Sequence, residues 1–334
     1  MTATKRTLKI HISAGIAACA IAIVGVCGTV SVAAAAEKVT YLLPAPSFLI
    51  AFGPWQVAKA KGYYKDAGLD VTFQTARGGV DVAKQVGAGN AVIGGGIGDT
   101  PIIVRANGIP VKAVAVLGGR SLMQLVVHAN SGINSIGDLK GKTITTMSYQ
   151  DTTYYALLGM MASVGLKKSD ANIQAAGPVN TWKLFLAGKS QAMAAVPDWL
   201  GIAYGAKVKV KVFPADEHFQ SMAQAILASD KTIKERPELI GKLVRATLKG
   251  MKDIMANPKE AAAAYVTAVP RWKDKMGAVI GTFGLYNKYV YPGQKVVGRM
   301  DEARLAKLQS FYKSQGFIRK TVPVKDLYTN QFVE

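Results

Sequence analysis

A glycine-rich stretch from Gly94 to Pro101, GGGIGDTP, contains residues that could bind a small ligand. Two common nucleotide-binding motifs do not fit it. A phosphate-binding loop requires Lys followed by Ser or Thr after its last glycine, but Asp99 and Thr100 stand there. The dinucleotide fingerprint counted from Gly94 requires a sixth-position glycine, which is Asp99 here. The stretch therefore predicts neither class of nucleotide site.

The same stretch is typical of a loop that contacts a ligand. We predict a short strand at residues 92–94, a glycine loop, and a helix with Thr100 as its N-cap and Pro101 in its first turn. Glycines let a ligand approach the backbone, and a helix N-terminus presents free N–H groups with partial positive charge. Gly98, Asp99 and Thr100 are therefore candidate ligand contacts.

Asp99 leaves two alternatives open. Because a bare carboxylate repels an anion, Asp99 either accepts hydrogen bonds from its own loop or meets a cationic or amino group of the ligand. The first alternative suits an alkanesulfonate, and the second suits taurine or an aminopyrimidine.

Further candidates stand near predicted helix starts. The stretch SYQDTT at 148–153 offers hydroxyl and N–H groups that could bind an oxyanion, or Asp151 or Thr152 could simply cap a helix. Tryptophans near helix starts could stack on a planar ligand or belong to the core. Arg77 and Arg120 follow strands and could pair with an anionic group, although we expect both at the surface. The candidates outside the glycine stretch are Trp55, Ser148, Tyr149, Asp151, Thr152, Thr153, Trp182, Asp198 and Trp199.

The motifs of several enzyme classes are missing from the sequence. Neither Gly-x-Ser-x-Gly nor His-Glu-x-x-His occurs, and no cysteine follows Cys19 and Cys27. His128 and His218 stand far apart and make a poor metal site. We therefore predict no catalytic residue, no metal and no cofactor.

The first 36 residues have the pattern of a secretory signal peptide. Lys5, Arg6 and Lys9 precede an apolar run that ends in three alanines at Ala36. We predict a signal peptide at 1–36, cleavage near Ala36 and a periplasmic protein. The alternative is that the apolar run stays as an anchor on the outer face of the membrane.

The chain carries a net charge of +20, from 41 Lys plus Arg against 21 Asp plus Glu. Export removes nucleic acid as a partner, and the basic residues are scattered rather than clustered with aromatic residues. The charge would attract small anions or an anionic membrane surface.

Strands and helices alternate along the first two thirds of the chain, which indicates parallel sheets covered by helices. In such sheets, ligands bind at the carboxyl ends of the strands, so the candidate loops of two α/β units would face one cleft. We predict strands at 39–43, 69–73, 92–94, 111–117, 143–147, 192–196 and 208–213, and helices at 54–61, 80–86, 152–164, 181–187, 237–256, 258–268 and 301–315.

Two similar stretches flank the second unit, LMQLVVHAN at 122–130 and MAQAILASD at 222–230. They are suited to be hinge strands, one leaving the first lobe and one returning to it. We therefore predict a first lobe at 37–128 plus 222–334 and an inserted second lobe at 129–221.

Three stretches together resemble the solute-binding proteins of nitrate, sulfonate and taurine ABC importers, a group also called NMT1/THI5-like. They are FGPWQVAKAKGYYKDAGLDVTF, HANSGINSIGDLKGKTI and ILASDKTIKERPELIGKLVRATLKGM. The resemblance implies the second type of periplasmic-binding-protein fold, with two lobes that close on a solute. GGGIGDTP is most similar to the Gly-Asp-x-Pro loop of aliphatic sulfonate binders, whereas Val196-Pro197-Asp198-Trp199 departs from their Trp-Asp-Pro.

The resemblance implies a monomeric, exported protein that delivers a small organic anion, sulfonate-like or taurine-like, to an ABC permease with its cytoplasmic ATPase. The alternatives are an aminopyrimidine or another heteroaromatic solute, nitrate, or a sensor adaptor in place of an importer. Fungal pyrimidine-synthesising enzymes are similar in fold but rely on a Cys-rich motif. Because the chain after Ala36 has no cysteine, we predict no enzymatic activity.

Overall fold

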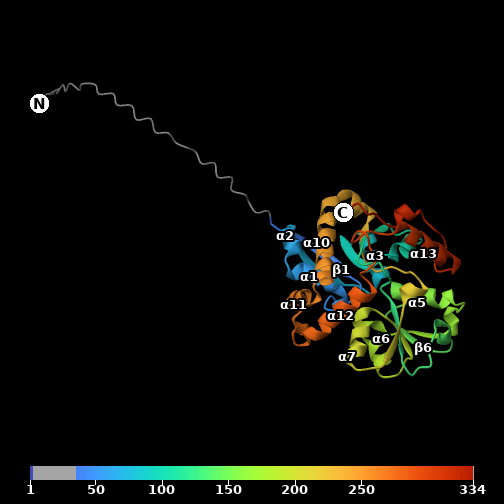
Figure 1. Ribbon diagram of the computed structural model, residues 1–334. Coiled ribbons are helices and arrows are strands. Elements are labelled where there is room, and N and C mark those ends of the chain that lie inside the picture. Colours follow the sequence, from blue (N-terminus) through green and yellow to red (C-terminus); the bar gives the residue numbers. More distant parts are fainter. Residues whose placement is uncertain (3–34, 334) are drawn as a thin grey trace. The chain divides into compact units, whose positions relative to one another are not determined.

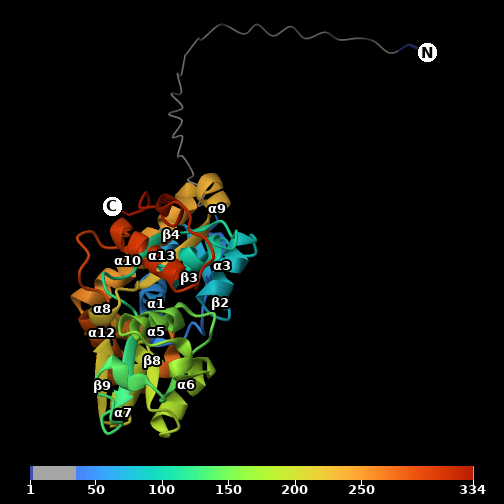
Figure 2. The ribbon, with the colours of Figure 1, turned by 90° about the vertical axis from the view of Figure 1, so that its right-hand side faces the viewer.

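Two five-stranded sheets organise the chain from Glu37 onward in the computed structural model (Figures 1 and 2). The structure describes residues 1–2 and 35–333, so nearly all of the predicted signal peptide at 1–36 lies outside the described residues. No helix among the described residues is long and apolar enough to cross a membrane.

The first sheet has the strand order β2-β1-β3-β10-β4, in which only β10 runs antiparallel to its neighbours. Its core strands are rich in buried Val, Ile, Leu and Ala, as expected for a sheet covered on both faces. In this order the strands are Leu69–Thr75, Glu37–Leu43, Ile93–Ile97, Gln224–Ser229 and Val111–Val116.

The second sheet repeats this arrangement in the order β7-β6-β8-β5-β9, with β5 as its antiparallel strand. The two successive α/β units and the two-lobed periplasmic-binding-protein fold expected from the sequence are thereby confirmed. In this order the strands are Asn172–Ala175, Thr143–Thr146, Ala192–Ala195, Gln124–His128 and Val210–Pro214.

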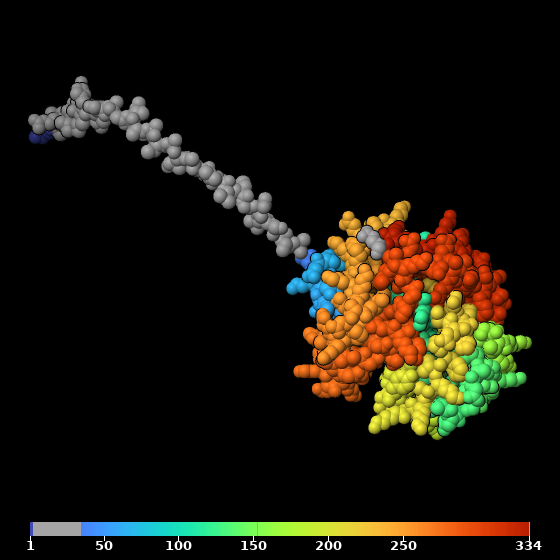
Figure 3. Space-filling model, viewed as in Figure 1, coloured from blue at the N-terminus to red at the C-terminus, as the bar shows by residue number. Residues whose placement is uncertain are grey.

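Helices pack around both sheets, and in the space-filling view the orange and red C-terminal part meets the yellow and green second lobe (Figure 3). The predicted helices at 237–256 and 258–268 are confirmed to the residue, whereas the helix at 276–289 was not predicted. The helices are α1 (Gly53–Ala60), α2 (Tyr63–Asp66), α3 (Gly79–Gly87), α4 (Thr100–Arg105), α5 (Thr152–Ser163), α6 (Gly177–Leu186), α7 (Pro197–Gly205), α8 (Ala215–His218), α9 (Asp230–Glu235), α10 (Pro237–Ala256), α11 (Pro258–Ala268), α12 (Met276–Tyr289) and α13 (Glu302–Ser314).

The chain crosses between the sheets twice, at residues 117–123 and 215–223, just before β5 and β10. The two crossing segments are hydrogen-bonded to each other, because the Leu122 N–H donates to the Met222 carbonyl oxygen at 3.1 Å. The predicted pair of hinge strands is therefore confirmed. The lobe boundaries stay predictions, and the pairing of β5 with the second sheet favours a first boundary near residue 123.

Arg304 of α13 forms hydrogen bonds with both crossing segments. Its guanidinium donates to the Gly119 carbonyl oxygen at 2.6 Å in the first segment, and to Asp216 at 2.5 Å and the Ser221 carbonyl oxygen in the second. One side chain near the C-terminus thus bonds to both connections between the lobes.

The prediction of a glycine loop directly after a strand at 92–94 is wrong, because Gly95 and Gly96 also lie within β3, which ends at Ile97. A Cβ atom on Gly94 would stand 2.2 Å from Val82 Cγ1, and one on Gly96 would stand 2.6 Å from Leu227 Cδ1. The glycines therefore let α3 and β10 pack closely against the strand. Close packing within the lobe therefore requires these glycines.

Candidate functional site

A cavity of about 540 Å³, its opening included, lies between the two lobes. Residues that end or follow β1, β3, β6 and β8 line it, which is where ligands collect in sheets of this kind. The two lobes touch beside it, because the Val80 N–H donates to the Gln150 carbonyl oxygen at 3.4 Å. The lining residues are Pro44, Ala45, Leu49, Ala51, Phe52, Gly79, Gly96, Ile97, Leu122, Met147, Asp151, Thr153, Val196, Asp198, Trp199 and Gln224.

Asp198 brings a buried carboxylate to this cavity from the first turn of α7. The side chain is 3 % exposed, and its Oδ1 has no hydrogen-bond partner among the residues that the structure describes. Burial raises the pKa of Asp198 to about 7, although backbone N–H groups at the helix start oppose the shift. The buried hydroxyls of Tyr265 and Tyr286 stand close enough for the carboxylate to help raise their pKa values. Asp198 Oδ1 is thus a buried acceptor without a donor among the described residues.

Asp151 brings a second buried carboxylate, from the start of α5. It accepts hydrogen bonds from Thr153, from the backbone N–H at 2.9 Å and from the hydroxyl, so its predicted role as a helix cap is confirmed. Burial raises the pKa of Asp151 above its ordinary value.

Apolar side chains form the rest of the wall. Trp199 lines the cavity at 3 % exposure, and its indole N–H has no partner among the described side chains and backbone. Phe52 lines the cavity from the opposite lobe. Trp55 is fully buried behind Phe52, and the centroids of the two rings are 5.8 Å apart. A flat apolar solute could contact Trp199 and Phe52, whereas Trp55 is a core residue.

The three candidates of the glycine stretch do not line the cavity. The Gly98 N–H donates to the Ala223 carbonyl oxygen at 2.9 Å, and Asp99 and Thr100 are fully buried. Thr100 is the first residue of α4, and the N-cap is Asp99. The Thr100 hydroxyl accepts from the Ile97 N–H at 3.1 Å and caps no N–H of the helix. That prediction is corrected. Of this stretch, Gly96 and Ile97 in β3 line the cavity, whereas Gly98, Asp99 and Thr100 make their contacts inside the first lobe.

Asp99 has a partner that the sequence did not suggest. The Tyr312 hydroxyl of α13 donates to its Oδ2 at 2.6 Å. Burial raises the pKa of Asp99 to about 6, and the hydrogen bond from Tyr312 opposes the shift. A residue more than 200 positions away therefore donates to one oxygen of this carboxylate, while the buried Oδ1 has no hydrogen-bond partner among the described residues.

The remaining candidates from the sequence lie around the opening or away from it. The Ser148 hydroxyl accepts from the Gln150 N–H, the exposed Tyr149 donates to the Ile173 carbonyl oxygen, and Thr152 is the first residue of α5. Trp182 is half-buried on α6. Arg77 and Arg120 are exposed, as expected, and neither lines the cavity.

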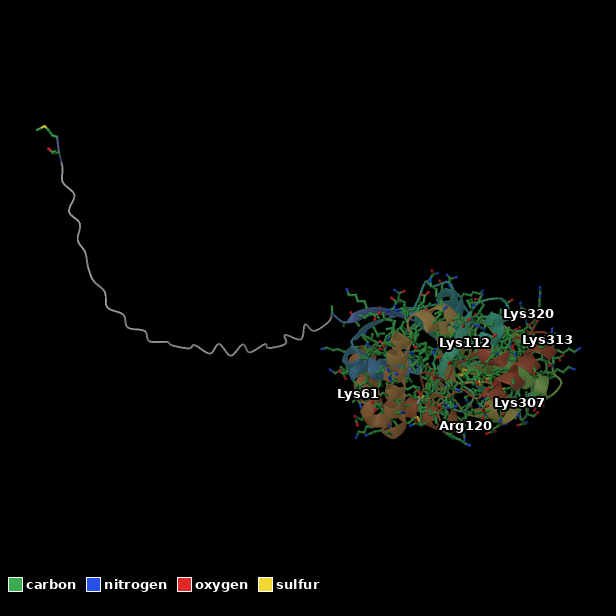
Figure 4. All side chains as sticks on the ribbon, turned by 90° about the horizontal axis from the view of Figure 1, so that it is seen from above. Lys61, Lys112, Arg120, Lys307, Lys313 and Lys320 are labelled. Carbon is green, nitrogen blue, oxygen red and sulfur yellow. The ribbon has the colours of Figure 1, made fainter. Side chains whose placement is uncertain are left out.

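The electrostatic character of the cavity is opposite to that of the whole chain. Its lining contains two aspartates but no Lys, Arg or His. The labelled basic residues are spread over the molecule, and none of them lines the cavity (Figure 4). A carboxylate-lined apolar cavity favours a ligand with N–H donors over an anion.

Sequence reasoning missed several lining residues, above all Gln224. It begins β10 inside the predicted return strand, and its side chain is 4 % exposed. The available signal was a polar residue at the start of an otherwise apolar strand, which is also the position of Gln124 in β5.

Residues 50–261 match the model of a protein family described as NMT1/THI5 like. The chain belongs to the NMT1/THI5-like family. A riboflavin-binding protein RibY from Chloroflexus aurantiacus is 28 % identical over 304 residues, which covers 85 % of this chain and 83 % of that protein. A yeast 4-amino-5-hydroxymethyl-2-methylpyrimidine phosphate synthase, THI12, is 24 % identical over 72 % of this chain and 74 % of its own length.

A solved structure extends the comparison of this NMT1/THI5-like chain. The alkanesulfonate-binding protein SsuA from Xanthomonas axonopodis, bound to MOPS, has a TM-score of 0.66 and 16 % identity over 89 % of this chain and 98 % of its own. At that identity the likeness concerns the fold alone. The NMT1/THI5-like chain thus shares its fold with sulfonate binders, while its more similar relatives carry names that refer to nitrogen heterocycles.

Proposed function

We propose that this protein captures a planar nitrogen heterocycle with N–H donors between its two lobes and delivers it to a membrane importer. The observation that carries the proposal is the lining, in which Asp151 and Asp198 are buried carboxylates and no cationic side chain accompanies them. A sulfonate or nitrate would bring a negative charge against two carboxylates, with no cation to compensate for lost hydration. The alternative of a heteroaromatic solute therefore takes precedence over the organic anion.

The shape and chemistry of the walls support the same class of solute. Trp199 and Phe52 offer ring surfaces for a flat molecule, and the unpaired Oδ1 of Asp198 gains a partner if the solute donates an N–H. Riboflavin and an aminopyrimidine, which the names of the relatives mention, both combine a flat ring with hydrogen-bond donors: one ring N–H and side-chain hydroxyls in riboflavin, and an amino group in the pyrimidine.

Export and transport complete the proposal. The sequence pattern at 1–36 supports export to the periplasm, and the fold supports hinge closure around the solute. Delivery would be made by the monomer to an ABC permease with its ATPase. The lining contains no Cys, Ser, Lys or His, and we propose that the protein returns its solute unchanged.

A thermal-unfolding screen tests the proposed function. The ligands are riboflavin, 4-amino-5-hydroxymethyl-2-methylpyrimidine, MOPS, taurine and nitrate, each at concentrations up to about 100 times an expected Kd. A ligand that binds only the folded state stabilises it by roughly 2.7 kcal/mol at that ratio. We expect a shift with at least one heterocycle and with none of the anions. Shifts with anions only, or conversion of the bound heterocycle into a product on chromatography, would refute the proposal.

A further inference from the structure

Gln224 lies where the second crossing segment meets the cavity. It is the first residue of β10, immediately after the second crossing segment, and it lines the cavity from the first lobe. The strand it begins lies between β3 and β4, in the interior of the first sheet. Its backbone is held on both sides, because it pairs with Ile97 of β3 and its carbonyl oxygen accepts from the Leu117 N–H at 2.7 Å.

The orientation of the Gln224 amide is fixed by its neighbour. Its Nε2 donates to the Ala51 carbonyl oxygen at 3.0 Å, and because a carbonyl oxygen only accepts, the amide cannot be reversed. Its Oε1 consequently faces away from that bond. That oxygen is buried and has no hydrogen-bond partner in the part of the chain that the structure describes. A buried acceptor without a donor is costly, and a donor from a ligand removes that cost.

We propose that Gln224 Oε1 accepts an N–H from the solute and, together with Asp198, determines its specificity. This inference rests on the proposed function. The two acceptors come from different lobes, Gln224 from β10 and Asp198 from α7, and both lack a donor within residues 35–333. The solute must then present hydrogen-bond donors in two directions, for example a ring N–H or amino group together with a hydroxyl or a second N–H. An alkyl sulfonate has no such donors.

The chain offers a matched control in Gln124, which begins β5 as Gln224 begins β10. Gln124 is fully buried, its Nε2 donates to the Ser121 carbonyl oxygen at 3.3 Å, and its Oε1 also lacks a partner among the described groups. It does not line the cavity. The two glutamines are alike in type, burial and strand position, and differ in access to the solute.

The test compares Gln224→Met and Gln124→Met by calorimetric titration of riboflavin and of 4-amino-5-hydroxymethyl-2-methylpyrimidine. Loss of a hydrogen bond to the solute should weaken the better of the two probes by roughly tenfold or more in Gln224→Met. Gln124→Met should bind within about twofold of wild type, because its amide contacts only protein. Gln224→Leu serves as a second variant if Gln224→Met does not fold.

Two results would overturn the inference while the proposed function stands. One is wild-type affinity in a folded Gln224 variant, and the other is an equal loss in the Gln224 and Gln124 variants, which would indicate a general effect on the hinge. If wild type binds neither probe but binds MOPS or taurine, the proposed function fails first, and the inference fails with it.

Discussion

Affinity for the solute should depend on pH through Asp198. Its pKa of about 7 in the free protein means that the carboxylate is largely ionised at pH 8 and largely protonated at pH 5.5. An N–H of the solute can donate to the ionised form, so binding is strongest above this pKa and is lost as the pH falls through it. If only the ionised form binds, the ionised fraction changes from about 90 % to about 3 %, and affinity falls about 30-fold.

The neighbours of Asp198 allow this effect to be isolated. Tyr265 and Tyr286 stay neutral throughout the range, because burial raises both pKa values above the ordinary value of 10. Asp151 also lines the cavity with a raised pKa and would act in the same direction. Asp198→Asn keeps the shape of the side chain and cannot ionise. Its affinity should be lower at pH 8 and nearly independent of pH down to 5.5, apart from the contribution of Asp151.

The assay is calorimetric titration with the heterocycle found in the thermal screen. It measures the affinities of wild type and of Asp198→Asn at pH 8, 7 and 5.5. The reasoning is refuted if wild-type affinity rises as the pH falls, which is the behaviour expected of an anionic solute near two carboxylates. It is also refuted if Asp198→Asn retains the full pH dependence, because the titrating group would then lie elsewhere.

Two further predictions concern the scaffold. Arg304→Met should lower the free energy of unfolding, measured in urea, by roughly 3 kcal/mol. The substitution removes a partly buried ion pair and leaves the acceptors of both crossing segments without their donor. The control is Lys307→Met at an exposed position of the same helix, which should change this free energy by less than about 0.5 kcal/mol. Equal stability of the two variants would contradict the role assigned to Arg304. Gly94→Ala should destabilise by about 1–3 kcal/mol because its Cβ meets Val82, whereas Gly281→Ala, in open space within α12, should be neutral or stabilising by up to about 1 kcal/mol. A neutral Gly94→Ala would show that α3 can move away from β3 at little cost.

The fold could be predicted from the sequence because its signals are local and repeated. Alternation of strands and helices, proline at helix starts and glycine at helix ends located most elements, and the helices that begin at Pro237 and Pro258 were correct to the residue. The strand β7 and the helix α12 were missed. β7 exposes most of its side chains at a sheet edge, and α12 carries three glycines, which obscure its apolar face.

The candidate site was predictable only where helix starts positioned it. Asp151 and Asp198 both stand in a first helical turn and both line the cavity, so local pattern was sufficient for them. The glycine stretch predicted the wrong contact residues, because its glycines allow close packing against segments distant in the sequence. Tyr312 of α13 donates to Asp99 Oδ2, and no local pattern indicates such a contact. The electrostatic character of the cavity was equally hidden, since the overall excess of basic residues says nothing of which side chains face inward.

The strand order of the first sheet has a consequence for how the chain reaches its folded state. β3 and β4 do not pair with each other, and the strand that joins them, β10, is supplied by residues 224–229. All strands of the second sheet precede it in the chain, so that sheet has every partner it needs before the first sheet can close. During synthesis from the N-terminus, β1, β2 and β3 can pair with one another early, but β4 and the free edge of β3 wait for β10. Completion of the first sheet therefore depends on pairing between segments far apart in the sequence, which is slower than local pairing.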